Sequence, residues 1–248
     1  MSGGLSFVAL GVGDAFSATH YSSSLAVESD GRWILVDCPH PIRKMLHDSR
    51  EATGGLDLDR VDAVLLTHLH ADHCSGVEGL AYYLHFVLGR RVTLVAHPQV
   101  ARRLWSGHLS AGMDRLMTPE RVRRAAGFEE FFDLVPLSFR APVRFGPFEI
   151  ACRATIHHVP STAFRIHAGG RTLGVSGDTA FDPRLIAWLA EADLIVHESN
   201  LGAHTPYEKL VSLPLAIRER MRLIHYPDGF DEVWTEIPAL TEGVRHVV

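Results

Sequence analysis

The sequence has 248 residues, of which 46% are hydrophobic and 21% are charged, and its formal net charge at pH 7 is -5. A chain of this size and composition buries a large core, so we expect one globular domain over residues 1–248. The acidic balance argues against a basic nucleic-acid surface, and no stretch approaches the roughly 20 apolar residues that a membrane-spanning helix needs. We therefore expect a small-molecule substrate and no membrane partner. A nucleic-acid partner is disfavoured but stays open, as does a homodimer.

The cysteines indicate the cellular compartment. Cys38, Cys74 and Cys152 form an odd set without C-x-x-C spacing, which is typical of reduced thiols and not of a disulfide framework. The segment Met1–Leu10 lacks a basic start and a long apolar core, so it does not have the pattern of a signal peptide. We therefore expect a cytoplasmic protein.

The first part of the chain predicts strands followed by a helix. Ser6–Leu10 has the pattern of a strand. Ser24–Glu28 and Trp33–Val36 flank Asp30-Gly31, which is a hairpin turn signal. Pro41–Arg50 is predicted to be helical, because proline is tolerated in the first turn of a helix.

A buried strand predicted at Ala63–Leu66 leads into the stretch T-H-L-H-A-D-H. In an extended segment His68 and His70 are two residues apart, so they point to the same side and can hold one ion together. Asp72 and His73 follow after the chain has turned, so they can face a second ion. Imidazole and carboxylate donors without thiolates suit zinc, manganese or iron.

The middle of the chain is the least regular part. Gly76–Leu88 predicts a largely buried helix, and Arg91–Ala96 predicts a strand. Residues 98–132 are rich in arginine, at Arg102, Arg103, Arg115, Arg121, Arg123 and Arg124. One interpretation is a cationic lid that shapes the pocket and grips a phosphate ester. The other interpretation is a solvated helical surface.

The remaining chain predicts a second sheet and a further helix. Asp182–Ala190 is predicted to be helical, with Asp182 as its N-cap and Pro183 in the first turn. Strands alternating with helices are typical of a layered α/β fold. The strands expected in the second sheet include Phe131–Leu137, Val143–Phe145 and Phe148–Thr155, and Leu194–Val196 returns as a later strand.

The stretch T-H-L-H-A-D-H resembles the H-x-H-x-D-H signature of the metallo-β-lactamase fold, whose later strand ends supply further ligands in the order His, Asp, His. Three runs match this order, namely Ile156-His157-His158, Gly174–Thr179 with Asp178, and Leu223–His225. The resemblance covers nearly the whole chain and is closest to the phosphodiesterase and ribonuclease Z-like branch. It implies an α/β protein with the four-layer αββα metallo-β-lactamase fold, in which residues 98–132 are a pocket-shaping insertion.

The resemblance also implies two divalent metal ions, with zinc expected and manganese or iron as alternatives. One ion would be held by His68, His70 and His157, the other by Asp72, His73 and His225, and Asp178 would bridge them. His158 competes with its neighbour for one ligand position. The family pattern of a later aromatic-Arg-aliphatic strand, here Phe164-Arg165-Ile166, fits with His157 as the ligand.

Other residues have supporting roles in related proteins. Asp37 closes a predicted strand, where it either supports the metal ligands or caps the next turn. Glu198 is expected to be a structural hydrogen-bond partner. His204 resembles the histidine with which phosphodiesterases contact phosphate and assist the leaving group, and the other interpretation is a loop histidine without a role. Asp72 could also orient the attacking hydroxide.

The candidate ligands argue against two of the reactions that proteins of this fold catalyse. Dinuclear β-lactamases carry Cys where Asp178 stands, and flavodiiron proteins usually carry Glu where His70 stands, so both activities are disfavoured. The short return from His157 to Asp178, together with His204, favours phosphodiesterases. Neither the cysteine-rich zinc site of one relative nor the basic protruding arm of tRNA endonucleases is evident.

We therefore expect a dinuclear metal-dependent hydrolase, a phosphodiesterase that cleaves a small or cyclic phosphate ester through metal-bound hydroxide. An acyl hydrolase resembling glyoxalase II, either a thioesterase or a lactonase, is the alternative enzyme. A metal-binding sensor without turnover is the alternative outside the enzymes, although the complete ligand set argues against it.

Overall fold

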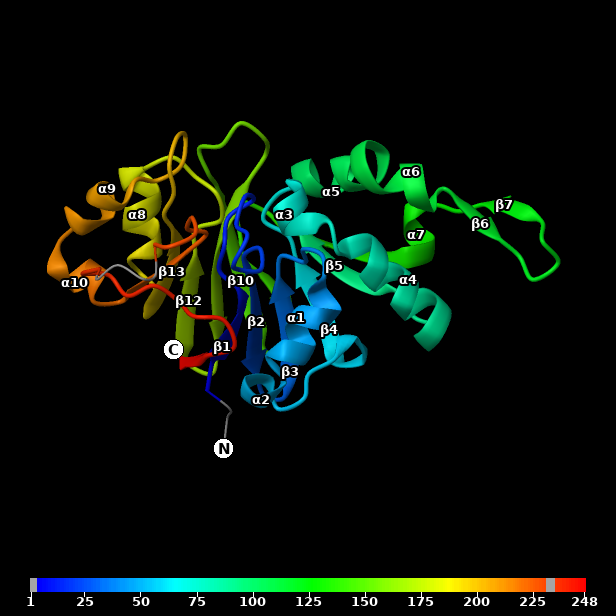
Figure 1. The fold of residues 1–248 in the computed structure, drawn as a ribbon, viewed down its shortest axis with the longest axis horizontal. Coiled ribbons are helices and arrows are strands. Elements are labelled where there is room, and N and C mark those ends of the chain that lie inside the picture. Colours follow the sequence, from blue (N-terminus) through cyan, green and yellow to red (C-terminus); the bar gives the residue numbers. More distant parts are fainter. Residues whose placement is uncertain (1–3, 231–234) are drawn as a thin grey trace.

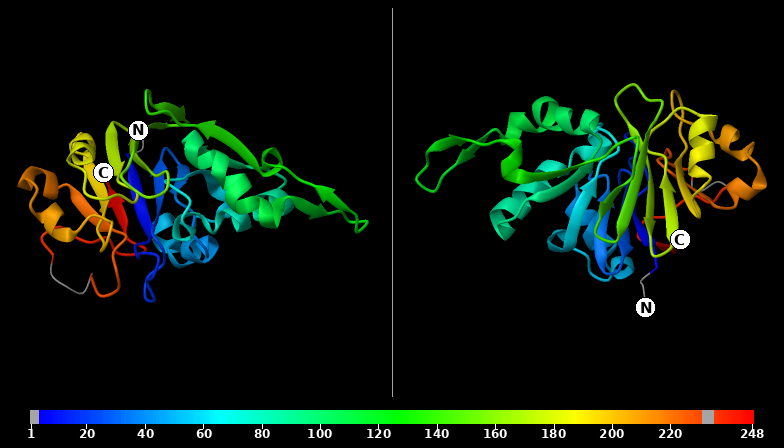
Figure 2. Two further views of the ribbon diagram at one scale, coloured as in Figure 1. Left: turned by 90° about the horizontal axis from the view of Figure 1, so that it is seen from above. Right: turned by 180° about the vertical axis from the view of Figure 1, so that it is seen from behind.

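The computed structural model describes residues 4–230 and 235–248, so the first three residues of the N-terminal segment considered above lie outside it. Two β-sheets pack face to face, and helices cover the outer face of each sheet (Figure 1 and Figure 2). This is the four-layer αββα arrangement that the sequence predicted, and the fold class is confirmed.

The first sheet has seven strands in the order β15-β1-β2-β3-β4-β5-β8. β2 and β3 form the predicted hairpin, in which Asp30 and Gly31 have φ of 51° and 74°, as a type I′ turn requires. From β3 onward the strands run parallel, so their carboxyl ends meet at one edge. The strands are β1 (Ser6–Gly11), β2 (Ser24–Ser29), β3 (Arg32–Val36), β4 (Val61–Leu65), β5 (Val92–Ala96), β8 (Phe132–Pro136) and β15 (Arg245–Val247).

The second sheet has six strands in the order β14-β13-β12-β11-β10-β9. β12, β13 and β14 run parallel, whereas β9 to β12 form an antiparallel meander. The strands are β9 (Val143–Phe145), β10 (Phe148–Ala154), β11 (Thr162–Ala168), β12 (Arg171–Val175), β13 (Leu194–Glu198) and β14 (Met221–Ile224).

Alternating side chains divide the core into layers. In β1, Phe7 and Ala9 pack between the two sheets, while Val8 and Leu10 face the helices of the first sheet. This two-residue period is the property that lets one strand serve two apolar layers. Each fully buried Phe, Leu or Val side chain contributes about 1.5–3 kcal/mol of transfer free energy, so burial on both faces anchors the sheet that carries the site.

The helices are short, and several begin and end where the sequence predicted. The Asp182 carboxylate accepts a hydrogen bond from the Arg184 backbone N–H at 2.8 Å, which confirms the N-cap of α8. Outside residues 98–132 the helices are α1 (Ile42–Asp48), α2 (Arg50–Thr53), the 3₁₀ turn η1 (Leu58–Arg60), α3 (Ala71–Cys74), α4 (Val77–Leu88), α8 (Pro183–Leu189), α9 (Tyr207–Val211) and α10 (Leu215–Arg218). None of the helices in the described part of the chain is long and apolar enough to cross a membrane.

Residues 98–132 form a separate group of small elements beside the first sheet, and part of it projects from the body (Figure 1 and Figure 2). The projecting part is a two-stranded hairpin of β6 and β7. Sequence reasoning found no counterpart of the basic, Gly/Pro-rich arm of tRNA endonucleases, and it did not predict this short hairpin, which carries Arg115, Arg123 and Arg124 and stands clear of both sheets. The elements are α5 (Pro98–Leu104), the π-helical turn η2 (Trp105–Leu109), α6 (Ser110–Met113), β6 (Arg115–Met117), β7 (Arg123–Ala125) and α7 (Phe128–Phe131).

The prediction that Phe131–Leu137 belongs to the second sheet was wrong. The strand β8 pairs in parallel with β5, with Ala96 opposite Pro136, and it forms an edge of the first sheet. The chain passes from this edge to β9, so the second sheet begins one strand later than expected.

Candidate metal centre

The T-H-L-H-A-D-H stretch leaves the first sheet at the carboxyl end of β4. His68 and His70 stay together as predicted, with His68 Nε2 3.0 Å from His70 Nδ1. The helix α3 then begins at Ala71, so the backbone turns and presents Asp72 and His73 as a second pair. His73 Nε2 lies 3.3 Å from Asp72 Oδ2. One short segment therefore supplies two adjacent donor pairs from a rigid strand end.

Three further side chains reach the same place from the second sheet. His157 lies in the loop after β10, Asp178 in the turn after β12, and His225 directly after β14. The turn before Asp178 needs Gly177, which has φ of +58° and whose added Cβ would stand 2.8 Å from the Thr162 carbonyl oxygen. His225 also has a left-handed φ of 58°, which costs a non-glycine residue about 1–3 kcal/mol and is held in place by its surroundings.

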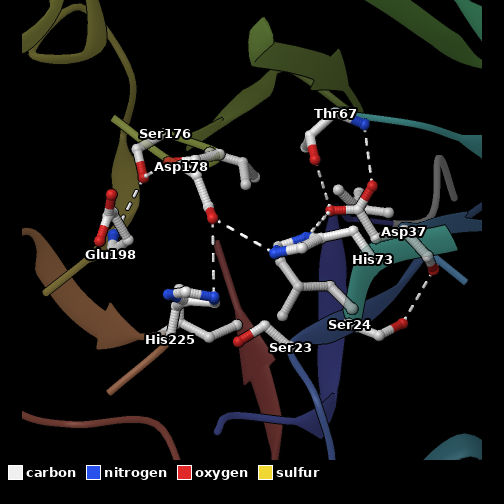
Figure 3. A pocket seen from close by; sticks show the side chains of 14 residues that line it. Ser23, Ser24, Asp37, Thr67, His73, Ser176, Asp178, Glu198 and His225 are labelled. Carbon is white, nitrogen blue, oxygen red and sulfur yellow. Dashed lines mark hydrogen bonds and ion pairs between the residues drawn. The ribbon is translucent and has the colours of Figure 1, made fainter. Parts of the chain in front are cut away.

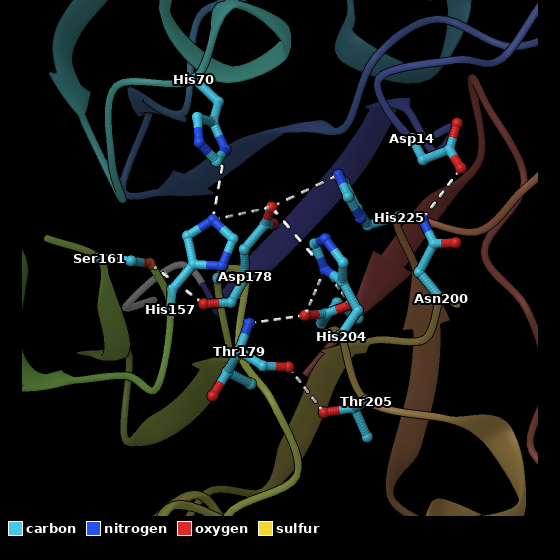
Figure 4. Close-up of polar contacts among 12 residues, drawn as sticks. Asp14, His70, His157, Ser161, Asp178, Thr179, Asn200, His204, Thr205 and His225 are labelled. Atoms are coloured by element: carbon cyan, nitrogen blue, oxygen red, sulfur yellow. Dashed lines mark hydrogen bonds and ion pairs between the residues drawn. The ribbon is translucent and has the colours of Figure 1, made fainter. Parts of the chain in front are cut away.

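The first donor group consists of His68, His70, His157 and Asp178, whose ligand atoms all lie within 4.8 Å of one another. His157 Nε2 is 3.2 Å from His70 Nδ1. His68 Nε2 is 3.5 Å from Asp178 Oδ2. Figure 4 shows His70 and His157 converging on the Asp178 carboxylate.

The second donor group consists of Asp72, His73 and His225. His225 Nε2 lies 3.2 Å from Asp72 Oδ2. Asp178 contacts this group as well, because its Oδ1 is 3.3 Å from His73 Nε2 and its Oδ2 is 3.7 Å from His225 Nε2 (Figure 3). Asp178 thus stands between the two groups, which is the position that a bridging ligand requires.

The hydrogen bonds behind the histidines fix which ring nitrogen faces the centre. Thr67 Oγ1 donates to Asp37 Oδ2 at 2.7 Å, so it can only accept from His68 Nδ1, which lies 2.9 Å away. His73 Nδ1 likewise donates to Asp37 at 2.8 Å. Both imidazoles therefore turn Nε2 toward the other donors. Among the described residues His73 Nε2 is buried and has no hydrogen-bond partner, as expected of an atom that binds an ion.

The charges of the buried groups also suit a cation. Burial lowers the pKa of His68 well below its usual value and lowers that of His157 to about 4, so both rings are neutral donors. Although burial opposes its charged form, Asp178 and Asp37 raise the pKa of His73 well above the usual value. Burial likewise opposes the Asp178 carboxylate, but His73 and His225 hold its pKa well below the usual range. Without a metal ion, the protonated His73 ring balances the negative charge of the Asp178 and Asp37 carboxylates. A bound divalent ion would neutralise that charge instead, so this set of donors suits divalent metal binding.

Asp37 contacts the metal-ligand candidates instead of capping a surface turn. The residue is buried, and its carboxylate accepts hydrogen bonds from Thr67 N, Thr67 Oγ1 and His73 Nδ1. Of the two sequence interpretations, the structure favours the one in which Asp37 orients a histidine. A carboxylate behind a metal-binding imidazole fixes its tautomer and increases its basicity.

The structure separates His157 from His158. The His157 side chain is 1% exposed and belongs to the first donor group. His158 is exposed, and its Nε2 lies 2.9 Å from His70 Nε2, on the side of that ring away from the other donors. The geometry therefore favours His157 as the ligand and places His158 behind His70.

His204 lies between the donor cluster and a buried glutamate. Its Nδ1 is 3.0 and 3.1 Å from the two carboxylate oxygens of Glu198 and 4.0 Å from Asp178 Oδ2 (Figure 4). Glu198 also accepts a hydrogen bond from the Thr179 backbone N–H at 2.6 Å. The hydrogen bond to Glu198 raises the pKa of His204. Glu198 is therefore more than a fold-stabilising residue, because it orients a histidine beside the centre.

The structure places the seven ligand candidates of the sequence close together, and it shows two features that sequence reasoning missed. The role of Thr67 in setting the His68 tautomer was not anticipated, although a hydroxyl at the end of a buried strand was a visible signal. The second feature is a recess beside the centre that includes Arg102 and Arg103 of α5. The sequence indicated only that the whole arginine-rich segment could reach the pocket.

Comparisons with known proteins agree with this fold and site. The family model of anti-Pycsar protein Apyc1 matches residues 5–241. The anti-Pycsar protein Apyc1 of Bacillus phage 010DV004 is 30% identical over 241 residues, which cover 92% of this chain and 91% of the relative.

Two solved structures extend the comparison to the fold. The metallo-β-lactamase fold protein YhfI from Bacillus subtilis has a TM-score of 0.72 at 20% identity, covering 92% of this chain and 89% of that chain. A diphosphatase from the PhnP family has a TM-score of 0.72 at 15% identity, covering 98% of both chains. The fold is therefore that of the metallo-β-lactamases, with the donor set of a metal-dependent hydrolase, and the chain belongs to the anti-Pycsar protein Apyc1 family.

Proposed function

We propose that this protein is a dinuclear metal-dependent phosphodiesterase that hydrolyses a small or cyclic phosphate ester. The observation that carries the proposal is the Glu198–His204 pair beside the donor cluster. A phosphodiester releases an alkoxide, which needs a proton in the transition state, and a histidine oriented by a carboxylate is suited to supply it. A thioester releases a stable thiolate and has little need of such a residue.

In this proposal, residues of the chain act at two places: Asp72 beside the attacking water and His204 beside the leaving oxygen. When bound, a pair of divalent ions supplies Lewis acidity and lowers the pKa of a water molecule. His68, His70, His157 and Asp178 would hold one ion, and Asp72, His73 and His225 would hold the other with Asp178. Asp72 would orient the water from the side opposite the leaving group. His204 keeps Nδ1 on Glu198, so Nε2 is the atom that gives a proton to the leaving oxygen.

The family name supports a biological role. The relatives are named anti-Pycsar proteins, and we propose that this chain also acts against the Pycsar system, by destroying a small phosphodiester. The segment 98–132 contributes α5 to the recess beside the donors, which supports the proposal that it shapes the substrate pocket. The ions are expected to be zinc, with manganese or iron as alternatives.

A substrate panel tests the proposal. The protein loaded with zinc or manganese is offered nucleoside 3′,5′-cyclic monophosphates, linear phosphodiesters, thioesters and lactones. The expected result is turnover of at least one phosphodiester with a much higher kcat/KM than any acyl substrate. Faster cleavage of a thioester or lactone would replace the proposal with an acyl hydrolase. Full metal loading without turnover of any of the four classes would support the sensor instead.

A further inference from the structure

Asp14 is a buried carboxylate that the proposed mechanism does not use. It lies in the loop after β1, and in the described part of the chain no basic side chain pairs with it. It accepts hydrogen bonds at 2.8 Å from the Phe16 backbone N–H and at 2.9 Å from Asn200 Nδ2, which is 186 residues away in the sequence (Figure 4). Because burying a carboxylate without a cation is unfavourable, this link has to be explained by what it holds in place.

Backbone contacts fix the position of Asp14. Its N–H donates to the carbonyl oxygen of Tyr226 at 3.2 Å, directly after the candidate ligand His225. The preceding Gly13 also pairs with Tyr226, and a Cβ added to this glycine would stand 2.7 Å from the Cβ of Ser17. The loop after β1 is therefore packed tightly against the segment that follows a ligand, so Asp14 is a rigid point of attachment.

Asn200 begins the turn that carries His204. Its backbone N–H donates to the Thr205 carbonyl oxygen at 3.1 Å, and its Oδ1 accepts from the Leu201 N–H at 2.7 Å. Its Nδ2 is the group that donates to Asp14. The Asn200 amide thus uses its oxygen for its own turn and its nitrogen for the loop after β1, and only one orientation of the amide satisfies both.

The two ends of this turn are restrained by side-chain contacts, whereas its middle is not. Residues 201–203 are exposed, and Gly202 among them has a left-handed φ of 71°. At the end of the turn, Thr205 Oγ1 donates to the Thr179 carbonyl oxygen at 2.9 Å. At its start, the link to Asp14 is the contact that ties the turn to another segment. Loss of that link would leave the turn anchored at one end only.

We propose that Asp14 is a positioning residue, which acts through Asn200 to hold His204 where its Nε2 reaches the leaving oxygen. Glu198 orients the imidazole ring by binding Nδ1, whereas the link between Asp14 and Asn200 holds the backbone that carries the ring. A displacement of about 1 Å in a reacting group costs up to roughly 10²-fold in rate. This inference rests on the proposed phosphodiesterase function and adds two residues on which proton donation depends.

A pair of substitutions that exchanges the two side chains tests the proposal. D14N places an amide N–H group against Asn200 Nδ2, and N200D places a carboxylate against Asp14, so each single change breaks at least one hydrogen bond of the link. In D14N/N200D the amide at position 14 donates to the carboxylate at position 200, whose second oxygen still accepts from the Leu201 N–H. The link is then restored with its direction reversed.

Turnover of two phosphodiesters measures the effect on proton donation. The thymidine 5′-phosphate esters of p-nitrophenol and of methanol release p-nitrophenolate and an alkoxide, respectively, from the metal-loaded protein. D14N and N200D should lower kcat for the methyl ester by roughly 10- to 100-fold, with KM, metal content and turnover of the p-nitrophenyl ester nearly unchanged. D14N/N200D should recover most of this loss. In an H204A background the single changes should cost nothing more, because they act through His204.

D228N is the matched control. The Asp228 carboxylate anchors the same loop by accepting hydrogen bonds from the Ser17 hydroxyl and, at 2.8 Å, from the Ala18 N–H. In the described part of the chain it makes no hydrogen bond to Asn200, so D228N should leave the ratio between the two esters unchanged. Hydrogen exchange of residues 200–205, followed by mass spectrometry, gives a measurement that does not depend on turnover. Exchange should be faster in D14N and N200D and normal in D14N/N200D and D228N.

Other outcomes separate the two proposals. Equal losses on both esters, or a loss that persists in the H204A background, would make the link purely structural and overturn the inference. Failure of D14N/N200D to recover, or a loss in D228N like that in D14N, would overturn it as well. If the wild type cleaves neither ester while hydrogen exchange behaves as expected, the link to the His204 turn stands and the phosphodiesterase proposal falls.

Discussion

The candidate metal centre and the adjoining segment 98–132 share one recess, but they are built in opposite ways. The seven donors come from four separate places in the chain, four of them are buried and three are partly buried, and both ring nitrogens of His68 and His73 have assigned roles. The segment consists of short elements with exposed arginines, and all three residues of β7 are exposed. From this comparison we expect the centre to be sensitive to substitution because its side chains hold one another in place, whereas we expect the exposed segment to tolerate substitutions that change substrate choice.

The largest effect is expected at the residue shared by both donor groups. D178A should lose both ions and all measurable turnover, because Asp178 contacts His73 and His225 as well as His68. Elemental analysis of the wild type should approach two metal equivalents per chain, and the variant should retain less than one.

D193A is the control for this change. Asp193 lies just before β13, and its carboxylate pairs with Arg171 at the surface. Its removal should leave metal content and turnover unchanged. Two retained equivalents in D178A would contradict the bridging assignment.

The same substitution at two neighbouring histidines, His157 and His158, tests which of them is the metal ligand. H157A should lose an ion from the first donor group and nearly all activity, because the buried Nε2 lies among those donors. H158A should keep the metal content and a measurable rate, since it removes only a contact to the outer side of His70. Metal analysis and turnover of the two variants decide between them, and the reverse pattern would make His158 the ligand.

The third prediction concerns the leaving group. H204A should keep both ions but lower phosphodiester turnover by roughly 10²–10⁴-fold, the usual contribution of a positioned acid. The loss should be largest for alkyl leaving groups and smallest for p-nitrophenyl esters, whose leaving group is already stable as an anion. Equal losses for all leaving groups would mean that His204 only contacts phosphate. Kinetics on a series of phosphodiesters, at matched metal loading, measure the difference.

A smaller loss of metal binding is expected from a change at Asp37, which contacts a candidate ligand and not the ion itself. The Asp37 carboxylate accepts three hydrogen bonds, two from Thr67 and one from His73. In D37N the side-chain NH₂ group replaces one carboxylate oxygen, so at least one of these hydrogen bonds is lost because two donors then face each other. Metal affinity should fall roughly 10–100-fold, as for other partners of metal-binding histidines. Asp62 pairs with Arg32 at the surface, so D62N should bind metal like the wild type in the same titration. Equal affinities of D37N and the wild type would contradict an orienting role.

The same comparison explains what the sequence could predict. Alternating strands and helices indicated a layered α/β fold. The αββα arrangement and the set of seven donors were implied by the resemblance to the metallo-β-lactamase fold, which the ligand-type residues at the ends of apolar runs made visible. The hairpin could not be predicted, since β6 and β7 have three residues each and no alternating pattern. The sheet to which β8 belongs depended on its pairing with β5, a contact distant in the sequence that local sequence does not specify.

The smallest effect is expected in the projecting hairpin, where neighbouring residues of β6 provide the comparison. Leu116 is 7% exposed and belongs to the core, whereas Met117 is 58% exposed. L116A should lower the free energy of unfolding by about 2 kcal/mol or more, because it leaves a cavity. M117A should change it by about 0.5 kcal/mol or less. Denaturant unfolding of the metal-loaded variants measures both values.

If M117A lowered the free energy of unfolding by more than this, the result would bear on the oligomeric state. It would show that this side chain is covered in solution, although no residue of the described chain covers it. The homodimer left open by the sequence would have that effect, and the cost would then depend on protein concentration, because dissociation exposes the covered surface. Unfolding measured at two protein concentrations, together with size-exclusion chromatography, distinguishes a covered hairpin from a free one. A free hairpin would leave the segment able to vary without affecting the stability of the centre.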